Sequence, residues 1–275
     1  NDIIWLDEAK STNEWVRNHF NSLDNLSVVS AISQTEGRGQ GEHRWHSAPG
    51  KNLTFSILVK EPDLPASDQA EISRWTAETI VHLLERHGID AWIKPPNDVW
   101  TGDKKICGIL IEHSLRANRI NRSILGIGLN VNQRNFDVTL PNPTSMVLCG
   151  EFSCGSGGQV ASDSVPHYEL QELLEEFMDI FRGYLDRYCH IRGGYGRLRH
   201  MYLSHLWRKD EPAQFIDCRS LSTSCNPLRT PNADTDNPPV FTGIIRGLSD
   251  AGLLIVEMHD GTMQEFTFKE ISYYI

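Results

Sequence analysis

A glycine-rich stretch near the N-terminus holds the residues best suited to bind an anion. Residues 36–45 read EGRGQGEHRW, with Arg38 between two glycines. Glycines let backbone N–H groups come close to an anion, and they accept positive φ angles. The guanidinium of Arg38 is a planar, permanently charged fork that matches a carboxylate or a phosphate, and Trp45 offers a flat face to a purine. For a glycine-rich loop alone, a flexible surface turn is the alternative interpretation.

A second motif combines oxygen-bearing side chains with lysines around two prolines. Residues 94–98 read KPPND, and KKICG follows at 104–108. The prolines favour a stiff turn at the end of a strand. Asn97 and Asp98 supply oxygens, and the carboxylate of Asp98 suits Mg²⁺. We expect Lys105 to lean over a pocket, whereas a solvated lysine pair on a hairpin is the alternative.

Two weaker motifs complete the set. Residues 126–132 read GIGLNVN, and the alternating small residues let a ligand or a backbone approach one face of a strand, with Asn130 on the same side. Residues 11–13 read STN ahead of a helical stretch, where a helix N-cap is the simple interpretation.

Hydrophobic patterns predict a mixed α and β fold for the elements that carry these motifs. Residues 106–112 are nearly all apolar, which predicts a central strand buried on both faces, and Asn118 marks the turn to its partner. A capping box of Asp68 and Glu71 predicts a helix that ends near Gly88. Further strands are predicted at 28–32, 53–59 (with an alternating pattern), 91–94 and 123–129, and further helices at 168–188 and 198–207.

The composition changes towards the C-terminus. Residues 217–239 combine several prolines with many Ser, Thr, Asn and Asp residues, which is typical of a polar loop or a disordered insertion. Short strands are predicted at 241–245, 252–258 and 263–268, and Asp260-Gly261 is a hairpin signal. We therefore expect a small β-module that either contains or follows the polar segment.

Charge and hydropathy exclude several classes of function. The 275 residues include 26 Lys and Arg against 36 Asp and Glu, so the net charge of -10 argues against general, phosphate-driven nucleic-acid binding. No apolar run reaches the ~18 residues of a membrane helix, and the start shows no signal peptide. We expect a cytoplasmic protein whose six cysteines are reduced thiols.

Taken in order, the four motifs resemble those of the biotin protein ligases. The pattern is S-T-N, Q-x-x-G-R-G…W, K-x-P-N-D…K-K-x-x-G-I-L-x-E and G-x-G-x-N-x-N, and it covers roughly residues 5–135. The resemblance implies an α+β fold with a mixed β-sheet flanked by helices, of the class II synthetase type, and a small C-terminal SH3-like β-barrel. We expect a catalytic domain at 1–208 and the SH3-like domain at 209–275, with the polar Pro-rich insertion at about 217–239.

The resemblance also implies an activity. The family joins biotin and ATP, with Mg²⁺, to form biotinyl-5′-AMP and pyrophosphate, and then transfers biotin to a lysine of a carboxylase's biotin carrier domain. The S-T-N motif leaves no room in this sequence for the N-terminal helix-turn-helix domain of bifunctional members. A monofunctional biotin–[acetyl-CoA-carboxylase] ligase without a nucleic-acid partner is therefore expected, and homodimerisation, which is common among such ligases, stays open.

Site roles carry over by position as expectations. Lys105, beside the biotin carboxyl group, and Arg38, on the carboxylate and then on the adenylate phosphate, are the catalytic candidates. The biotin-binding set is Ser11, Thr12, Asn13, Gln34, Gly37, Arg38, Gly39, Gln40, Lys105, Gly108, Gly126 and Gly128. The set for ATP and the adenylate is Arg38, Arg44, Trp45 (stacked on adenine), Asn97 and Asn130. Asp98 is the candidate for Mg²⁺ and for the base that accepts the carrier lysine's proton.

Departures from the family pattern leave alternatives open. Gln40 stands where many members have a second loop arginine, so either the adenylate is held more loosely or Arg44 takes that role along a different loop path. Pro95 stands at a position that is usually tryptophan. A lipoate or octanoate ligase or transferase of the same superfamily is one alternative function, and a non-catalytic biotin-binding sensor is another. The polar Ser11, Thr12 and Gln34 favour biotin, and the presence of Lys105 favours catalysis.

Overall fold

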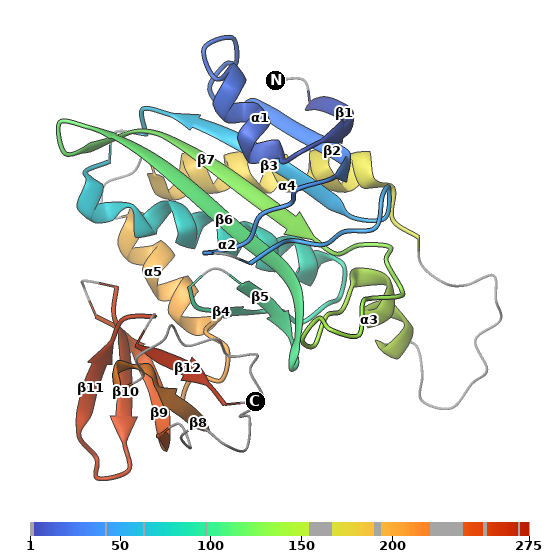
Figure 1. Ribbon diagram of the computed structural model, residues 1–275. Helices are drawn as coiled ribbons and strands as arrows, with labels where there is room; N and C mark the ends of the chain where they lie inside the picture. Colours follow the sequence, from blue (N-terminus) through green and yellow to red (C-terminus); the bar gives the residue numbers. More distant parts are fainter. Residues whose placement is uncertain are drawn as a thin grey trace. The chain divides into compact units, whose positions relative to one another are not determined.

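The protein is described here by a computed structural model that covers residues 3–41, 43–62, 64–96, 98–153, 167–189, 194–220, 239–249, 252–268 and 270–274. The chain forms two compact units (Figure 1). The first unit comprises residues 1–93 and 97–199, and the second comprises residues 94–96 and 200–275. The expected domain boundary between residues 208 and 209 stays a prediction.

A seven-stranded mixed sheet is the centre of the first unit (Figure 1). The strand order is β1-β2-β3-β7-β6-β5-β4. The bounds are β1 Ile3–Ala9, β2 Val28–Gln34, β3 Leu53–Lys60, β4 Trp92–Lys94, β5 Asp98–Thr101, β6 Lys104–Arg116 and β7 Arg119–Leu129. Strand β1 runs parallel to β2, whereas β2 with β3, β3 with β7, β7 with β6 and β6 with β5 are antiparallel. The predicted strands are confirmed, and β1 and β5 are additional.

Two helices cover one face of this sheet, α2 (Ala70–Arg86) and α4 (Leu170–Tyr184). Phe55 of β3 meets Phe177 edge-on at 5.1 Å between ring centroids, and Trp75 stacks on Phe181 at 4.1 Å. The indole N–H of Trp75 donates to the carbonyl oxygen of Phe181 at 3.1 Å. Burying each such ring contributes about 1.5–3 kcal/mol, so this face forms the main core and holds the sheet rigid beneath the site.

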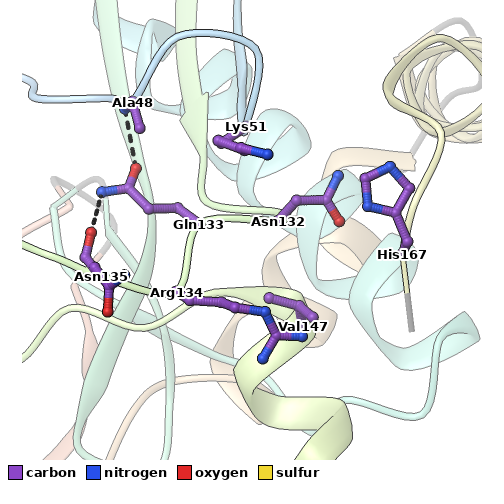
Figure 2. A pocket seen from close by; sticks show the side chains of 8 residues that line it. All are labelled: Ala48, Lys51, Asn132, Gln133, Arg134, Asn135, Val147 and His167. Carbon is purple, nitrogen blue, oxygen red and sulfur yellow. Dashed lines mark hydrogen bonds between the residues drawn. The ribbon is translucent and has the colours of Figure 1, made fainter. Parts of the chain in front are cut away.

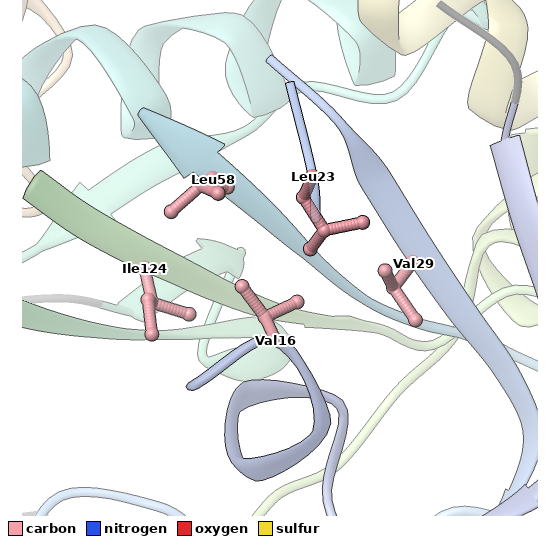
Figure 3. Close-up of a cluster of buried hydrophobic side chains, with 5 residues drawn as sticks. All are labelled: Val16, Leu23, Val29, Leu58 and Ile124. Carbon is pink, nitrogen blue, oxygen red and sulfur yellow. The ribbon is translucent and has the colours of Figure 1, made fainter. Parts of the chain in front are cut away.

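The opposite face has an apolar part and a part made of small and polar residues. Helix α1 (Thr12–His19) lies over the apolar part. A buried cluster forms there from Val16, Leu23, Val29, Leu58 and Ile124 (Figure 3). Further along the same face, Gly126 pairs with Ser56 and Gly128 pairs with Gly108, so their small side chains share one side of the sheet. This second part is the floor on which a site can form.

Strands β3 and β6 differ from their predicted burial. Strand β3 alternates in sequence, yet it is buried throughout except at Lys60. The reason is that α2 and α4 cover one of its faces and α1 covers the other. Strand β6 was predicted to be buried on both faces, but Gly108, Leu110 and Glu112 are only partly buried. The reason is that these three residues face the open floor rather than the helices.

The capping box predicted at Asp68 and Glu71 is wrong. Asp68 lies in a 3₁₀ turn, Ala66–Asp68, and the N-cap of α2 is Gln69. Glu71 is 1% exposed and pairs with Arg74 at 2.7 Å and Arg199 at 2.6 Å. A carboxylate that is buried needs charged partners, and this requirement outweighs a cap.

The remaining helices follow the predictions in part. The helix expected at 168–188 is α4 followed by a π-helical turn, Leu185–Cys189, and the helix expected at 198–207 is α5, Gly194–Ser204. Helix α3, Met146–Ser153, is additional. Over the described parts of the chain, the helices are all too short or too polar to span a bilayer.

A five-stranded antiparallel sheet forms the second unit (Figure 1). Its order is β11-β10-β9-β8-β12, with bounds β8 Pro212–Asp217, β9 Val240–Leu248, β10 Leu254–Met258, β11 Met263–Phe266 and β12 Ile271–Tyr273. The sheet confirms the expected C-terminal β-module and is consistent with an SH3-like domain. Among the described residues no pairing joins β11 to β12, so a closed barrel is not formed.

The polar segment is an insertion in this module. Strands β8 and β9 pair at Ile216 and Val240, so residues 217–239 connect two adjacent strands. The segment is described only to Ser220 and from Pro239 onward. Cys218 is disulfide-bonded, unlike the free thiols of Cys107 and Cys149, so the expectation of reduced cysteines does not hold throughout.

Candidate functional site

Four polar side chains meet where β2 ends, α1 begins and β3 crosses the floor. The backbone N–H of Thr12 donates to Gln34 Oε1 at 2.8 Å. Ser56 Oγ lies 2.7 Å from Thr12 Oγ1 and 2.6 Å from Asn13 Oδ1. Asn13 and Ser56 are fully buried, and Gln34 is half-buried. The structure therefore brings together three residues that the sequence assigned to biotin, and it adds Ser56.

Ser11 occupies the N-cap position of α1 without acting as a side-chain cap. Its backbone is extended, and in the described structure its hydroxyl makes no capping hydrogen bond. The residue is 4% exposed. A buried hydroxyl that does not serve the helix is available to a ligand, so the N-cap alternative loses its main support.

The side chain of Asn13 packs directly against the backbone of Gly126. A Cβ atom at Gly126 would lie 2.3 Å from Asn13 Oδ1, so glycine lets the carboxamide rest against the sheet. The structure places Gly126 beneath Asn13, and its expected part in binding biotin stays a prediction. Ser56 was missed by the sequence analysis, although a polar residue inside the apolar strand LTFSILV was its available signal.

Trp45 lies on the other two glycines of the floor. A Cβ atom at Gly128 would lie 2.3 Å from Trp45 Cε2, and one at Gly108 would lie 2.9 Å from Cζ3. The indole Nε1 is buried and has no hydrogen-bond partner among the described residues. The Lys105 ammonium lies 5.6 Å from the ring centroid. The ring thus forms a wall over the floor next to the lysine.

The glycine-rich loop is a narrow hairpin. The Gly39 N–H donates to the His43 carbonyl oxygen at 2.7 Å, and the Trp45 N–H donates to the Gly37 carbonyl oxygen at 3.0 Å. A Cβ atom at Gly37 would lie 2.4 Å from the Trp45 carbonyl oxygen, so the close approach of the two arms requires glycine. The exposed Gln40 precedes the turn at Gly41, whose φ is 66°.

The hairpin places two arginines opposite one another. Arg38 and Arg44 are bridge partners on its two arms, and side chains of directly opposed residues lie on the same side. Both are exposed, and Arg38 Nη2 lies 3.8 Å from Glu14 Oε2. The structure therefore brings Arg44 beside Arg38, the arrangement needed if Arg44 replaces the arginine missing at Gln40.

Lys105 and Asp98 form an ion pair at the end of the floor. Lys105 Nζ lies 2.8 Å from Asp98 Oδ1, and the two side chains are 29% and 33% exposed. Among the described residues no group of three or more His, Cys, Asp and Glu side chains is suited to hold a metal. Asp98 is paired with Lys105, and its role as a Mg²⁺ ligand stays a prediction. Asn97 lies outside the described residues.

Cys107 is part of the core. It is fully buried next to the site strand, and burial raises the pKa of its thiol far above the usual range. A thiol that resists ionisation is a poor nucleophile. Its proximity to Lys105 therefore does not indicate a catalytic cysteine.

Asn130 presents a buried acceptor at the end of β7. Its Nδ2 donates to the Thr144 carbonyl oxygen at 2.9 Å, while its Oδ1 is buried and unpartnered among the described residues. The Thr144 N–H in turn donates to the Lys105 carbonyl oxygen at 2.9 Å. An unpartnered buried acceptor costs about 1–3 kcal/mol, a cost that a ligand with an N–H donor would remove.

A cavity of about 400 Å³ lies beyond Asn130 (Figure 2). Figure 2 shows the side chains of Lys51, Arg134 and His167 around it. Gln133 holds one wall, because its Oε1 accepts from the Ala48 N–H at 3.0 Å. The remaining lining residues are Asn132, Asn135 and Val147. The sequence analysis missed this cavity, because Lys51 and Arg134 lie in loops without a recognisable motif.

The fold and the site define a class, a mixed-sheet ligase domain of the biotin and lipoate type. Residues 5–130 match the model of the biotin/lipoate A/B protein ligase family. Among solved structures, the biotin protein ligase from Aquifex aeolicus in complex with biotin and ATP has a TM-score of 0.72 at 21% identity, covering 99% of this chain and 98% of that chain.

Proteins related in sequence distinguish the biotin ligases from the other members of this class. The bifunctional ligase/repressor BirA of Bacillus subtilis is 36% identical over 261 residues, which cover 94% of this chain and 70% of that protein. The biotin–[acetyl-CoA-carboxylase] ligase of Mycobacterium tuberculosis is 28% identical over 127 residues, or 45% of this chain and 46% of that protein. The chain belongs to the biotin protein ligase family.

Proposed function

We propose that this protein is a biotin–[acetyl-CoA-carboxylase] ligase. It joins biotin and ATP to biotinyl-5′-AMP and pyrophosphate, and it then transfers biotin to a lysine of a biotin carrier domain. One observation carries the proposal: one face of one sheet holds a buried polar cluster, a glycine floor and the Lys105–Asp98 ion pair. The Aquifex aeolicus relative, which is named as a complex with biotin and ATP, supports both substrates.

The polar cluster suits the ureido ring of biotin. Thr12 and Gln34 provide hydrogen-bonding groups beside the buried Ser11 hydroxyl. A fatty acyl chain offers no partner for these groups, and a buried polar group left unpaired costs about 1–3 kcal/mol. The same site therefore favours biotin over lipoate or octanoate.

The first reaction step needs positive charge near the carboxylate. A carboxylate oxygen of biotin forms a bond to the α-phosphorus of ATP, and the bond from that phosphorus to the oxygen bridging to the β-phosphate breaks. Lys105, Arg38 and Arg44 stabilise the charge on the phosphoryl oxygens and hold the two substrates together. Mg²⁺ enters as part of the nucleotide substrate, with ligands from its phosphates and with Asp98 as the candidate ligand from the protein.

The nucleotide has two natural points of attachment. The buried Oδ1 of Asn130 suits the amino group of adenine, and the aromatic ring of Trp45 suits stacking on the adenine ring. Lys51 and Arg134 in the neighbouring cavity suit phosphate oxygens. Thr144 links Asn130 to Lys105, because its carbonyl oxygen accepts from Asn130 and its N–H donates to the Lys105 carbonyl oxygen.

The second step is an acyl transfer. The neutral amine of the carrier lysine attacks the acyl carbon of the adenylate, the bond from that carbon to the phosphate oxygen breaks, and AMP leaves. Asp98 is our candidate for the group that takes the amine proton. Normal transfer from preformed adenylate by Asp98→Asn would rule that role out.

Biotin transfer to a carrier domain tests the proposal. The protein is incubated with biotin, Mg·ATP and an isolated biotin carrier domain, and the mass of the domain is measured. We expect a gain of one biotin on the native domain and no gain when its acceptor lysine is replaced by arginine. An unchanged mass in all reactions would contradict the proposal.

A cytoplasmic location and the absence of a nucleic-acid partner belong to the same proposal.

A further inference from the structure

The carboxamide of Asn13 is held in one orientation. Its Nδ2 donates to the Leu110 carbonyl oxygen at 3.3 Å and to Glu112 Oε2 at 3.0 Å. Neither a carbonyl oxygen nor a carboxylate can donate a hydrogen bond. A flipped carboxamide would place its oxygen against two acceptors, so Oδ1 must face Ser56.

This orientation decides which way the next hydroxyl points. Asn13 Oδ1 can only accept, and it lies 2.6 Å from Ser56 Oγ. Ser56 has one proton, and that proton goes to Asn13. Thr12 Oγ1 lies 2.7 Å from Ser56 Oγ and 3.3 Å from Gln34 Oε1, so its proton goes to the nearer acceptor, Ser56. The chain of hydrogen bonds runs from Thr12 through Ser56 and Asn13 to Glu112.

The end of the chain faces the site as an acceptor. With its proton directed to Ser56, Thr12 Oγ1 offers lone pairs only. Gln34 Oε1 accepts the Thr12 backbone N–H, so the donor end of that carboxamide, Nε2, points away towards Gly37. Thr12 thus offers an acceptor and Gln34 a donor, which match the N–H and C=O groups of a urea.

Glu112 is fixed by a partner on the same helix as Asn13. Arg17 lies one turn further along α1, and its Nη2 donates to Glu112 Oε1 at 2.5 Å. The two carboxylate oxygens are therefore divided, one to Arg17 and one to Asn13. Both side chains are about one-third exposed, so the pair orients Glu112 more than it stabilises the fold.

We propose that Glu112, oriented by Arg17, is a positioning residue that sets the hydrogen-bond direction of the Asn13–Ser56–Thr12 chain and so makes Thr12 an acceptor for a ureido N–H. The inference rests on the proposed function and adds a determinant of biotin specificity. Glu112 acts through three other residues and does not touch the substrate.

Steady-state ATP–pyrophosphate exchange with varied biotin tests the proposal. Glu112→Met removes the nearer of the two acceptors that fix Asn13, and we expect the KM for biotin to rise about 10-fold with kcat changed less than 2-fold. Glu112→Gln keeps an oxygen acceptor and should restore most of the affinity. Glu176→Met is the matched control, because it removes a partly buried carboxylate paired with Arg86 and His87 elsewhere in the unit; its KM should not change.

A double variant separates a hydrogen-bond chain from a local structural effect. If Glu112 acts through Ser56, then Glu112→Met adds little to the KM of Ser56→Ala, because the chain is already broken. Additive increases would overturn the proposal, as would an unchanged KM in Glu112→Met. These results leave the proposed function intact as long as the native protein performs biotin-dependent exchange, and an inactive native protein would refute the function itself.

Discussion

At the scale of single residues, two glycines on one strand serve different side chains. Gly126 makes room for Asn13, and Gly128 makes room for Trp45. Both lie on the same face of β7, and that face receives α1 at one end and the hairpin of residues 37–45 at the other. Substitutions at the two positions should therefore impair different parts of the site.

Gly128→Ala should displace the indole of Trp45. The new methyl group would lie 2.3 Å from Trp45 Cε2, so the ring must move away from the floor. Inserting one methyl group into a packed site costs about 1–3 kcal/mol, and we expect the KM for biotin or ATP in pyrophosphate exchange to rise about 10-fold. Adding Trp45→Ala to this variant should restore biotin binding in part. Native values of both KMs in Gly128→Ala would show that Trp45 does not occupy this position in solution.

Lys105→Met should remove the adenylation step without unfolding the protein. The ammonium lies beside the floor, and its pair with Asp98 is partly exposed, so its loss should cost only about 1 kcal/mol of stability. We expect exchange to fall about 100-fold or more, while Lys105→Arg retains more activity because it keeps the charge. Thermal unfolding provides the control, and exchange within 3-fold of native in Lys105→Met would contradict the assigned role.

Much of the site was predictable from residue types, but its internal contacts were not. Thr12, Gln34, Arg38 and Lys105 stand out because motif spacing marks them. Ser56 was a polar residue in an apolar strand, and the strand register that places it opposite Gly126 shows that it belongs to the site. Glu112 was part of a recognised motif, yet its bond to Asn13 spans 99 residues of sequence. Such contacts depend on sheet order, which local patterns do not specify.

At the scale of elements, a buried charge cluster fixes α2. Glu71 is 1% exposed between Arg74 and Arg199. Arg74→Met should lower the free energy of unfolding by about 3 kcal/mol, which is the lower limit of the usual cost of breaking a buried ion pair. We expect the lower limit because Arg199 still contacts Glu71. Urea unfolding measures the change. The double variant Glu71→Met with Arg74→Met should be more stable than Arg74→Met alone, and a further loss of stability would refute this account of the cluster.

His113 on β6 should make stability depend on pH. Burial lowers its pKa from the usual 6.5, and its Nδ1 lies 2.7 Å from Ser123 Oγ. Because the unfolded chain binds the proton more readily, the folded state loses stability as the pH falls through 6.5 towards the lower folded pKa, and the loss is absent above that window. The drop in Tm between about pH 7.5 and pH 5.5 should therefore be smaller in His113→Gln. An equal drop in the two proteins would contradict this assignment.

The strands with strong patterns were predicted well, whereas β5 and β12 were not predicted. Strands β2, β3, β6 and β7 carry apolar runs that make them recognisable. Strand β5 has four residues and β12 has three, so their pairing partners rather than their own patterns make them strands. Glu71 was likewise assigned to a cap from local pattern, whereas its burial depends on Arg199, which is distant in the sequence.

At the scale of the whole molecule, an acidic chain gathers its functional cations at one site. The net charge is -10, yet Arg38 and Arg44 share one hairpin and Lys105 lies by the floor near Trp45. Local clustering of this kind lets a protein bind a phosphorylated small molecule without general affinity for nucleic acids. The acidic composition therefore agrees with the proposed reaction, in which ATP is the only polyphosphate required.

ATP–pyrophosphate exchange with biotin, lipoate and octanoate in parallel tests the central claim most directly. The reactions contain Mg²⁺ and no carrier domain, so they report only the adenylation of the acid. The account predicts exchange with biotin and none with the other two acids, because only biotin carries the urea that Thr12 and Gln34 can recognise. Exchange with lipoate or octanoate in place of biotin would assign the protein to the sister activity. The absence of exchange with all three would contradict an adenylating ligase and leave a biotin-binding sensor.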